Sequence, residues 1–192
     1  MPRRDYVSDL DNSMPAAKSA LLCTNLQSLI NKVNGITNLL NGAELLVGPV
    51  TLSRGTPDTT IGSTAFNYSV NGVVAQKAAA NTAIGAQTVT ADRWALYRLT
   101  IASGGTITVT PAAGNAAGYT SEGAAIAAIP AVPANQVDMG YITVKTKVGT
   151  TFVAATDALA GGATGNVASV THYVPATAGV DVTPITSLTA LP

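Results

Sequence analysis

The sequence has few charged residues. Only 10% of its 192 residues are Asp, Glu, Lys or Arg, and ten acidic residues balance ten basic ones, whereas about 25% is usual. A soluble monomer normally keeps a charged surface for colloidal stability, so this composition predicts a surface partly buried against other copies or a larger assembly. The alternative is a monomer with a neutral Thr, Ser and Asn surface. The hydrophobic fraction of 47% excludes wholesale disorder.

Basic clusters, disulfide partners and long apolar runs are also missing. The basic residues are scattered from Arg3 to Lys147, which argues against nucleic-acid binding. The single cysteine, Cys23, excludes an intrachain disulfide framework. No apolar run approaches the roughly 20 residues that a membrane span needs. Residues 1–11 are polar and do not resemble a signal peptide, so we expect a protein made and folded in a cytoplasm.

Residues that carry catalysis or bind metals are rare. The one histidine, His172, lies in a predicted strand, and no Gly-x-Ser-x-Gly motif accompanies it. The acidic group Asp5, Asp9 and Asp11 lacks the glycine and the terminal glutamate of a calcium loop. Cys23 has no nearby basic group that would activate its thiol. We therefore predict a protein that is not an enzyme and has no metal or cofactor. A glycosidase-like pair of carboxylates that meet only in space stays open.

An apolar heptad pattern runs through residues 16–47. Leucine, valine and isoleucine residues are spaced alternately four and three apart, as in a coiled coil: Leu22, Leu26, Leu29, Val33, Ile36 and Leu40. The same register extends to Ala43 and Val47, and Pro15 stands just upstream, where a helix start tolerates proline. Ile30 and Leu39 flank this seam, so the apolar stripe is wider than a dimer needs. The pattern predicts a helical oligomerisation stalk that forms a homotrimer; the alternative is a single amphipathic helix packed on its own β domain.

From about residue 45 the apolar period changes to two, which predicts strands. Asn71-Gly72 between apolar runs indicates a hairpin with a type I′ turn. Further hairpins are predicted over residues 93–110 and 140–155, a short helix over 119–129, and a last strand over 167–174. Residues 48–175 are therefore predicted to form an antiparallel, β-sandwich-like domain with one short helix. Periodicity does not distinguish a sandwich from another twisted antiparallel arrangement.

Both ends of the chain differ from this body. Residues 1–15 hold five charged residues and are predicted to be a docking arm, with Arg3, Arg4, Asp5 and Tyr6 as the contact residues. Residues 176–192 are rich in Pro, Thr and Ala, which is typical of an extended segment bound to a surface.

Two segments carry a family resemblance. Residues 124–134 (AAIAAIPAVPA) followed by 139–144 (MGYITV) resemble a module of tailed-bacteriophage virion structural proteins, in which an alanine- and proline-rich stretch precedes a Gly-Tyr strand. The strand and turn at 94–110 and the segment 152–159 (FVAATDAL) are similar to the elements that surround this module. The resemblance covers roughly residues 90–175 and implies a head-decoration, head-fibre or tail-fibre role without catalytic residues.

Together these observations predict a non-enzymatic, homotrimeric decoration or fibre protein that is attached to a capsid and located in the virion. Its expected partners are its own copies and capsid or other virion proteins, with no nucleic acid and no membrane. The alternative is a host-recognition module of a tail fibre, in which exposed tyrosines such as Tyr119, Tyr141 and Tyr173 bind a host glycan.

Overall fold

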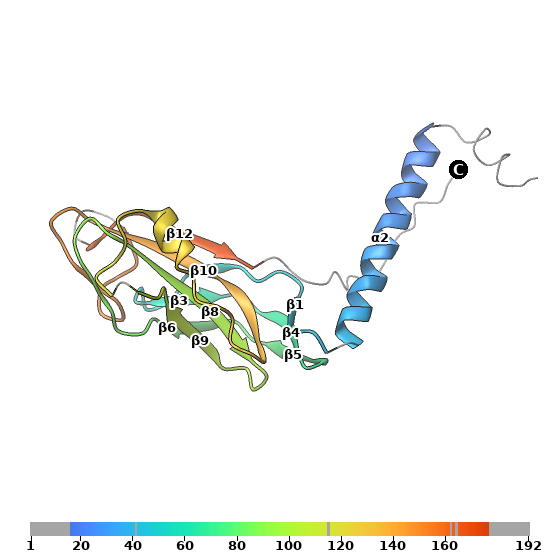
Figure 1. Cartoon of the computed structure of the whole chain (residues 1–192), viewed down its shortest axis with the longest axis horizontal. Coiled ribbons are helices and arrows are strands. Elements are labelled where there is room, and N and C mark those ends of the chain that lie inside the picture. The colour runs from blue at the N-terminus through green and yellow to red at the C-terminus, as the bar shows by residue number, and fades with distance from the viewer. Residues whose placement is uncertain (1–15, 41, 115, 162, 164, 177–192) are drawn as a thin grey trace, which may run out of the picture.

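The computed structural model describes residues 16–40, 42–114, 116–161, 163 and 165–176. These residues form a long N-terminal helix, α2 (Ala16–Leu40), then antiparallel strands and a short helix, α3 (Glu122–Ala127) (Figure 1). The prediction of a mainly β chain with an N-terminal helix and one short helix is confirmed. The predicted docking arm (1–15) and all but the first residue of the predicted tail (176–192) lie outside the described residues.

The N-terminal helix ends at Leu40, so its predicted extension to Val47 is wrong. Val47 lies instead in strand β1 (Leu45–Val47), where it is buried and pairs with Asn67 of β4. Gly42 has a φ angle of 76°, which is the left-handed conformation in which helices commonly end. The heptad spacing continues beyond this glycine by coincidence, and the body begins at Leu45.

In the described part of the chain, the strands form four antiparallel sheets. Two of them have three strands each: β1 (Leu45–Val47), β4 (Phe66–Val70) and β5 (Val73–Lys77) in one, and β2 (Leu52–Arg54), β3 (Thr60–Ser63) and β6 (Ala80–Ala83) in the other. The largest sheet has the order β12 (Val167–Pro175), β10 (Gln136–Thr146), β8 (Trp94–Ala102) and β9 (Ile107–Pro111). A small sheet pairs β11 (Phe152–Val153) with β7 (Thr88–Val89).

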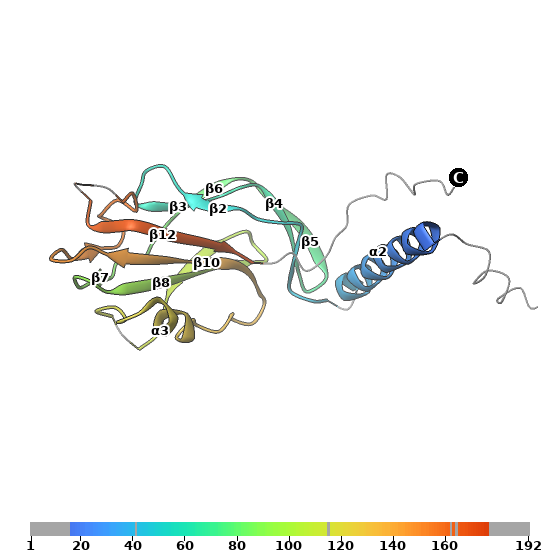
Figure 2. The same ribbon diagram turned by 90° about the horizontal axis from the view of Figure 1, so that it is seen from above.

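The main core lies between the large sheet and the two three-stranded sheets, which form a second layer over it (Figure 2). Its largest fully buried side chains come from both layers, and they include Ile61, Tyr97, Met139, Ile142 and Phe152. This arrangement is consistent with the predicted β-sandwich-like body, because apolar side chains of two facing sheets interdigitate in one core.

Two of the three predicted hairpins are confirmed. Strands β4 and β5 pair across Asn71 and Gly72, whose φ angles are 52° and 75°, and two consecutive positive φ angles match the predicted type I′ turn. Strands β8 and β9 form the second hairpin. The third prediction is wrong. Strand β10 pairs with β8 and β12, whereas Phe152 of β11 pairs with Val89 of β7.

A β-bulge at Met139 divides strand β10. Before it Val137 faces the main core, and after it Ile142 and Val144 do. Gly140 allows this bulge because its φ angle is 110° and a Cβ atom there would lie 2.2 Å from the carbonyl oxygen of Val174. Within residues 139–144, Gly140 is therefore a position that requires glycine. The strand around it is covered on both of its faces.

Helix α3 covers the outer face of the large sheet (Figure 2). Ser121 caps it by accepting a hydrogen bond from the Ala124 N–H group at 3.2 Å. Ala125 is fully buried and packs with Leu96 of β8, while Trp94 and Tyr141 border this second core. The predicted short helix over 119–129 is confirmed with narrower bounds.

Candidate functional site

The predicted seam of α2 is exposed in the single chain. Its five residues with described side chains, Leu22, Leu26, Leu29, Val33 and Ile36, are each 44 to 55% exposed. The helix points away from the β body in both views (Figure 1, Figure 2). Leu40 is the last residue of the helix, and its side chain is not among those described. The alternative that this helix packs on its own β body therefore does not match the geometry.

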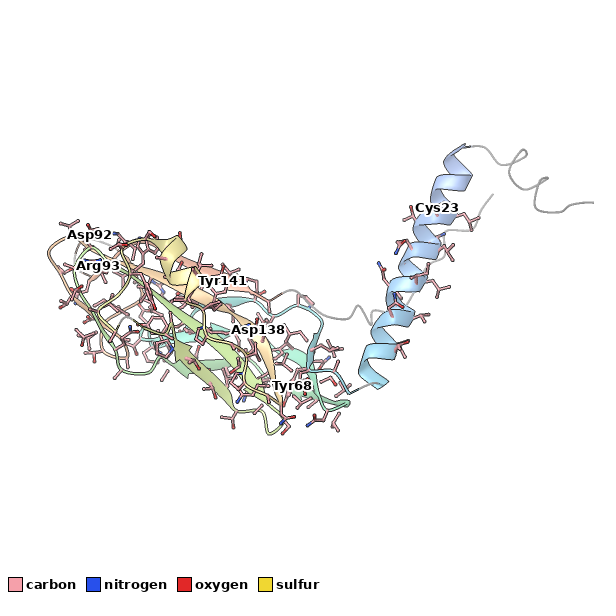
Figure 3. The ribbon with its side chains drawn as sticks, viewed as in Figure 1. Cys23, Tyr68, Asp92, Arg93, Asp138 and Tyr141 are labelled. Atoms are coloured by element: carbon pink, nitrogen blue, oxygen red, sulfur yellow. The ribbon has the colours of Figure 1, made fainter. Side chains whose placement is uncertain are left out.

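The flank of the seam carries a second narrow apolar strip. At 100° per residue, Cys23, Ile30 and Thr37 follow one another along one side of the seam. Ile30 is 42% exposed, and Cys23 is exposed as well (Figure 3). The Thr37 hydroxyl donates to the carbonyl oxygen of Val33 at 2.9 Å, so its polar group is satisfied within the helix. We call these three residues the flank strip.

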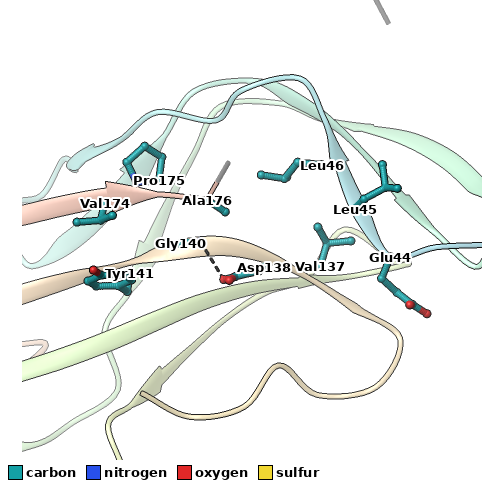
Figure 4. Close-up of a pocket in the computed structure, with 10 residues that line it drawn as sticks. All are labelled: Glu44, Leu45, Leu46, Val137, Asp138, Gly140, Tyr141, Val174, Pro175 and Ala176. Atoms are coloured by element: carbon teal, nitrogen blue, oxygen red, sulfur yellow. Dashed lines mark hydrogen bonds between the residues drawn. The ribbon is translucent and has the colours of Figure 1, made fainter. Parts of the chain in front are cut away.

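A groove lies where the helix meets the body (Figure 4). It has a volume of about 440 Å³ and is lined by residues 44–46, by the first half of β10 and by the end of β12. Leu45, Val137 and Ala176 give it an apolar wall, and Glu44 and Asp138 supply carboxylates. Sequence reasoning did not find this neck groove, because it joins segments about 90 and 130 residues apart in the chain.

The neck also bears an exposed apolar strand edge that sequence reasoning missed. Strand β5 is at the edge of its sheet, and its first two residues, Val73 and Val74, are 68% and 52% exposed. Natural proteins usually protect such edges with charges or proline, and here the only charged residue of the strand is Lys77. Consecutive valines after the Asn-Gly turn were the available signal.

One ion pair lies on the outer face of the large sheet. The Arg98 guanidinium donates from Nε to Oδ1 of Asp138 at 3.1 Å, from Nη2 to Oδ2, and from Nη1 to the carbonyl oxygen of Pro130. Asp138 Oδ1 also accepts the N–H of Gly140 at 3.0 Å. Arg98 therefore connects the β-bulge with the proline-rich segment after α3.

A second ion pair lies at the far end of the body. Lys145 donates to Asp92, and its Nζ atom is 5.7 Å from the centre of the Trp94 ring. The hydrogen bond and the positive charge of Lys145 lower the pKa of Asp92. Figure 3 shows Asp92 at the opposite end of the molecule from α2, so this pair is not connected with the seam.

Three further carboxylates of the body have a partner within it. Glu122 accepts from Thr143 at 2.6 Å, Asp157 accepts from the backbone N–H of Val153 at 2.6 Å, and Asp58 lies 3.4 Å from Arg54. Within the described part of the chain, no three His, Cys, Asp or Glu residues gather where they could hold a metal ion. The predicted carboxylate group Asp5, Asp9 and Asp11 is outside this part.

The three tyrosines proposed to bind a glycan do not gather on one surface. Tyr119 and Tyr141 border the small core beneath α3, whereas Tyr173 packs against the main core on the other face of the sheet. The hydroxyl of Tyr119 donates to the carbonyl oxygen of Ala113, and burial raises the pKa of Tyr173. Glycan binding through a shared platform of these residues has no support in this arrangement and stays a prediction.

The other predicted residues are placed as follows. His172 is in strand β12, where its backbone pairs with Thr143. The docking residues Arg3, Arg4, Asp5 and Tyr6 are outside the described residues. Among the helices that the structure describes, none is long and apolar enough to cross a membrane.

Comparison with known proteins adds no relative. No protein-family model, curated protein or solved structure matches the chain.

Proposed function

We propose that this chain is a self-assembling, non-enzymatic structural protein of a bacteriophage virion. Copies associate through the seam of α2 into a homotrimer, and each β body forms a knob on the resulting stalk. The observation that carries the proposal is the half-exposed seam on a helix that points away from a body with its own core.

The exposed seam favours self-association for an energetic reason. Most helical stability in proteins comes from packing of an apolar face and not from the intrinsic helix propensity of the segment. Burying apolar surface contributes roughly 25 cal/mol per Å², and α2 has 25 residues with a row of Leu, Val and Ile along it. A second and a third copy have the same apolar row, so heptad packing buries the row of every copy.

Three copies fit the width of the apolar stripe. In a dimer the a and d positions alone are buried, and the flanking position of Ile30 stays in water. A trimer covers more of each helix. The sparse charge of the chain, 10%, also agrees with a surface that is shared among copies and with the particle.

The virion assignment is supported by the resemblance of residues 124–134 and 139–144 to the phage module. A trimer also strengthens weak attachment, because three docking arms bind together with high effective concentration. We propose that residues 1–15, with Arg3, Arg4, Asp5 and Tyr6, attach the trimer to a capsid or another virion protein. Deleting residues 1–15 should leave the trimer intact and abolish its co-sedimentation with the particle that carries the protein.

The solution mass tests the assembly directly. The full chain should sediment at about three times its monomer mass of 19.2 kDa, and residues 45–192 should sediment as a monomer. A monomeric full chain at micromolar concentration contradicts the proposal. A trimeric fragment 45–192 places the interface in the body instead of the stalk.

A matched pair of substitutions separates the seam from helix propensity. Val33 is in the seam, and its neighbour Asn34 faces outward, yet both are exposed in the single chain. Val33→Asp should dissociate the trimer, because it places a carboxylate in a buried interface. Asn34→Asp introduces the same residue and should leave the mass unchanged. Equal effects of the two changes contradict a buried seam.

A further inference from the structure

The sheet of β1, β4 and β5 has two different surfaces at its two edges. At one edge, β1 borders the neck groove, which Leu45 and Leu46 help to line (Figure 4). At the other edge, β5 exposes Val73 and Val74, which we call the β5 edge. Strand β4 lies between β1 and β5, so the two outer strands are about 10 Å apart. The groove and the β5 edge therefore face in opposite directions.

Both surfaces adjoin the segment that links α2 to the body. A Cβ atom at Gly42 would lie 3.7 Å from the carbonyl carbon of Asn71 and 3.8 Å from the backbone nitrogen of Gly72, so the turn between β4 and β5 lies against this segment. Glu44, two residues further on, lines the neck groove. Figure 1 shows α2 ending beside this sheet. Association of the α2 helices therefore brings the grooves and the β5 edges of different copies close together.

The two surfaces are also complementary in shape and chemistry. The β5 edge is a protruding apolar surface, with Val73 and Val74 68% and 52% exposed. The groove is a hollow of about 440 Å³ with an apolar wall of Leu45, Val137 and Ala176, so burial of the valines there removes apolar surface from water. In the described body, β12 lies close to β2 and β6 close to β9, whereas β5 packs closely on β4 alone.

We propose that the β5 edge of each copy docks into the neck groove of the next copy, so that three copies form a closed ring at the root of the stalk. The proposal rests on the proposed function, because the stalk supplies the high effective concentration that so small a contact needs. A contact between two different surfaces is heterologous and closes into a ring when the rotation fits. The ring also covers an exposed strand edge of the kind that otherwise promotes aggregation.

The pairing within the sheet defines the register of this contact. Leu45 of β1 and Val74 of β5 both pair with Ser69 of β4, so they lie at the same level along the strands and on the same face. A three-fold axis along these strands rotates each copy without shifting it along the axis. Val74 of one copy therefore lies level with Leu45 of the next.

A disulfide between these two positions tests the ring in the full chain. In a Cys23→Ser background, Leu45→Cys with Val74→Cys should give covalent trimers under mild oxidation, measured by non-reducing electrophoresis. The Cα atoms of the two positions are about 10 Å apart within one chain, and cysteines more than about 7 Å apart cannot be bridged. Every disulfide between them therefore joins two copies.

Matched variants control for chance encounters of cysteines. Gln76 is also exposed on β5 and lies on the same face as Val74, but it is about 7 Å further along the strand. Leu45→Cys with Gln76→Cys should therefore cross-link about ten-fold less than Leu45→Cys with Val74→Cys. Leu45→Cys alone and Val74→Cys alone should form no disulfide, because the ring does not bring either position close to its own copy.

A charge at the β5 edge gives a measurement without cysteines. Val74→Lys should raise the concentration at which half of the trimer dissociates by about ten-fold, because it places an ammonium group in an apolar contact. Gln76→Lys adds the same charge to the same strand and should leave this concentration unchanged. Urea unfolding followed by Trp94 fluorescence shows whether both bodies stay folded. Equal dissociation of the two folded variants overturns the ring.

The solution mass of the same samples separates the ring from the stalk. A trimer in which Leu45→Cys and Val74→Cys form no disulfide overturns the ring and keeps the stalk. A disulfide in Val74→Cys alone shows that two β5 edges pair with each other, which also overturns the ring. Covalent species longer than a trimer show that the contact does not close. A full chain that stays monomeric and forms no disulfide overturns both proposals.

Discussion

The N-terminal helix and the β body differ in how they bury apolar side chains. In the body, Ile142 and Phe152 have no exposed surface, and residues from both layers form one core. On α2, Leu26 and Val33 are more than half exposed. The body is therefore stabilised within one chain, whereas the helix depends on a partner. Its stability should accordingly rise with protein concentration, as expected for a folded state coupled to association.

The largest effect should come from opening the core of the body. Phe152→Ala removes a fully buried ring and should lower the free energy of unfolding by about 3–5 kcal/mol. Urea unfolding followed by the fluorescence of the only tryptophan, Trp94 of β8, reports on the body. Leu26→Ala should leave the midpoint of this unfolding transition unchanged and should weaken the association of the α2 helices instead. Equal shifts for both variants contradict the independence of the two regions.

The next largest loss of stability should come from straining the backbone of the body. Gly140→Ala places a methyl group against the Val174 carbonyl and forces a non-glycine residue to a φ angle of 110°. We expect a loss of about 2–4 kcal/mol, because strain and a clash combine. Gly123→Ala is the matched control. Gly123 is in α3 with nothing near the added Cβ atom, so alanine should stabilise by about 0.5–1 kcal/mol. A neutral Gly140→Ala contradicts the bulge geometry.

The next smaller losses of stability should come from breaking the ion pairs. Arg98→Met removes the guanidinium from Asp138 and from the Pro130 carbonyl and should cost about 1–3 kcal/mol. Lys145→Met breaks a more exposed pair and should cost less, because solvent screens such pairs. Thermal unfolding of both variants at low and high salt measures the difference. A larger loss for Lys145→Met contradicts the assigned role of Arg98.

The acid dependence of the Lys145 pair has a definite sign. The folded-state pKa of Asp92 is lowered from its usual 3.8, so the pair stabilises above that pH and its contribution is lost as pH falls through the folded pKa. Lys145→Met should remove this part of the acid dependence, whereas Arg98→Met should keep it.

Local patterns predicted a large part of the fold. Asn71-Gly72 predicted a hairpin because two positive φ angles suit few other residue pairs, and apolar alternation predicted β8 with β9. The alternative pairing of Phe152 with Val89 could not be predicted, since it joins residues far apart in the chain. Strand β6 (Ala80–Ala83) has no large apolar side chain, so it carries no period to detect.

The candidate site shows the same limit. Spacing alone predicted the seam from Leu22 to Ile36. It did not predict that this seam is exposed, because exposure depends on whether the body covers the helix. Gly42 was available as a signal for the end of the helix. Ala43 and Val47 continue the heptad spacing beyond this glycine, and this spacing led to the prediction of a longer helix. Gly140, next to the β-bulge at Met139, lines the neck groove, and only the folded sheet reveals this bulge.

The smallest effect at neutral pH should come from a hydroxyl group. Tyr97 is fully buried in the main core, and its hydroxyl has no hydrogen-bond partner among the described residues. Tyr97→Phe removes this unpaired group and should change the free energy of unfolding by less than about 1 kcal/mol, with stabilisation as the favoured sign. Tyr119→Phe is the control that loses a hydrogen bond.

Above pH 10 the same substitution should have a clear signature. Burial raises the pKa of Tyr97 well above its usual 10.0, so the unfolded chain loses this proton first as the pH rises. The contribution of Tyr97 to the free energy of unfolding is therefore fully present below pH 10 and is lost as the pH rises towards the folded-state pKa. Urea unfolding at pH 8, 10 and 11 should show a shallower loss for Tyr97→Phe than for Tyr119→Phe. Because burial also raises the pKa of Tyr173, the double variant Tyr97→Phe, Tyr173→Phe should be shallower still. Equal slopes for wild type and the double variant would contradict the burial of these two tyrosines.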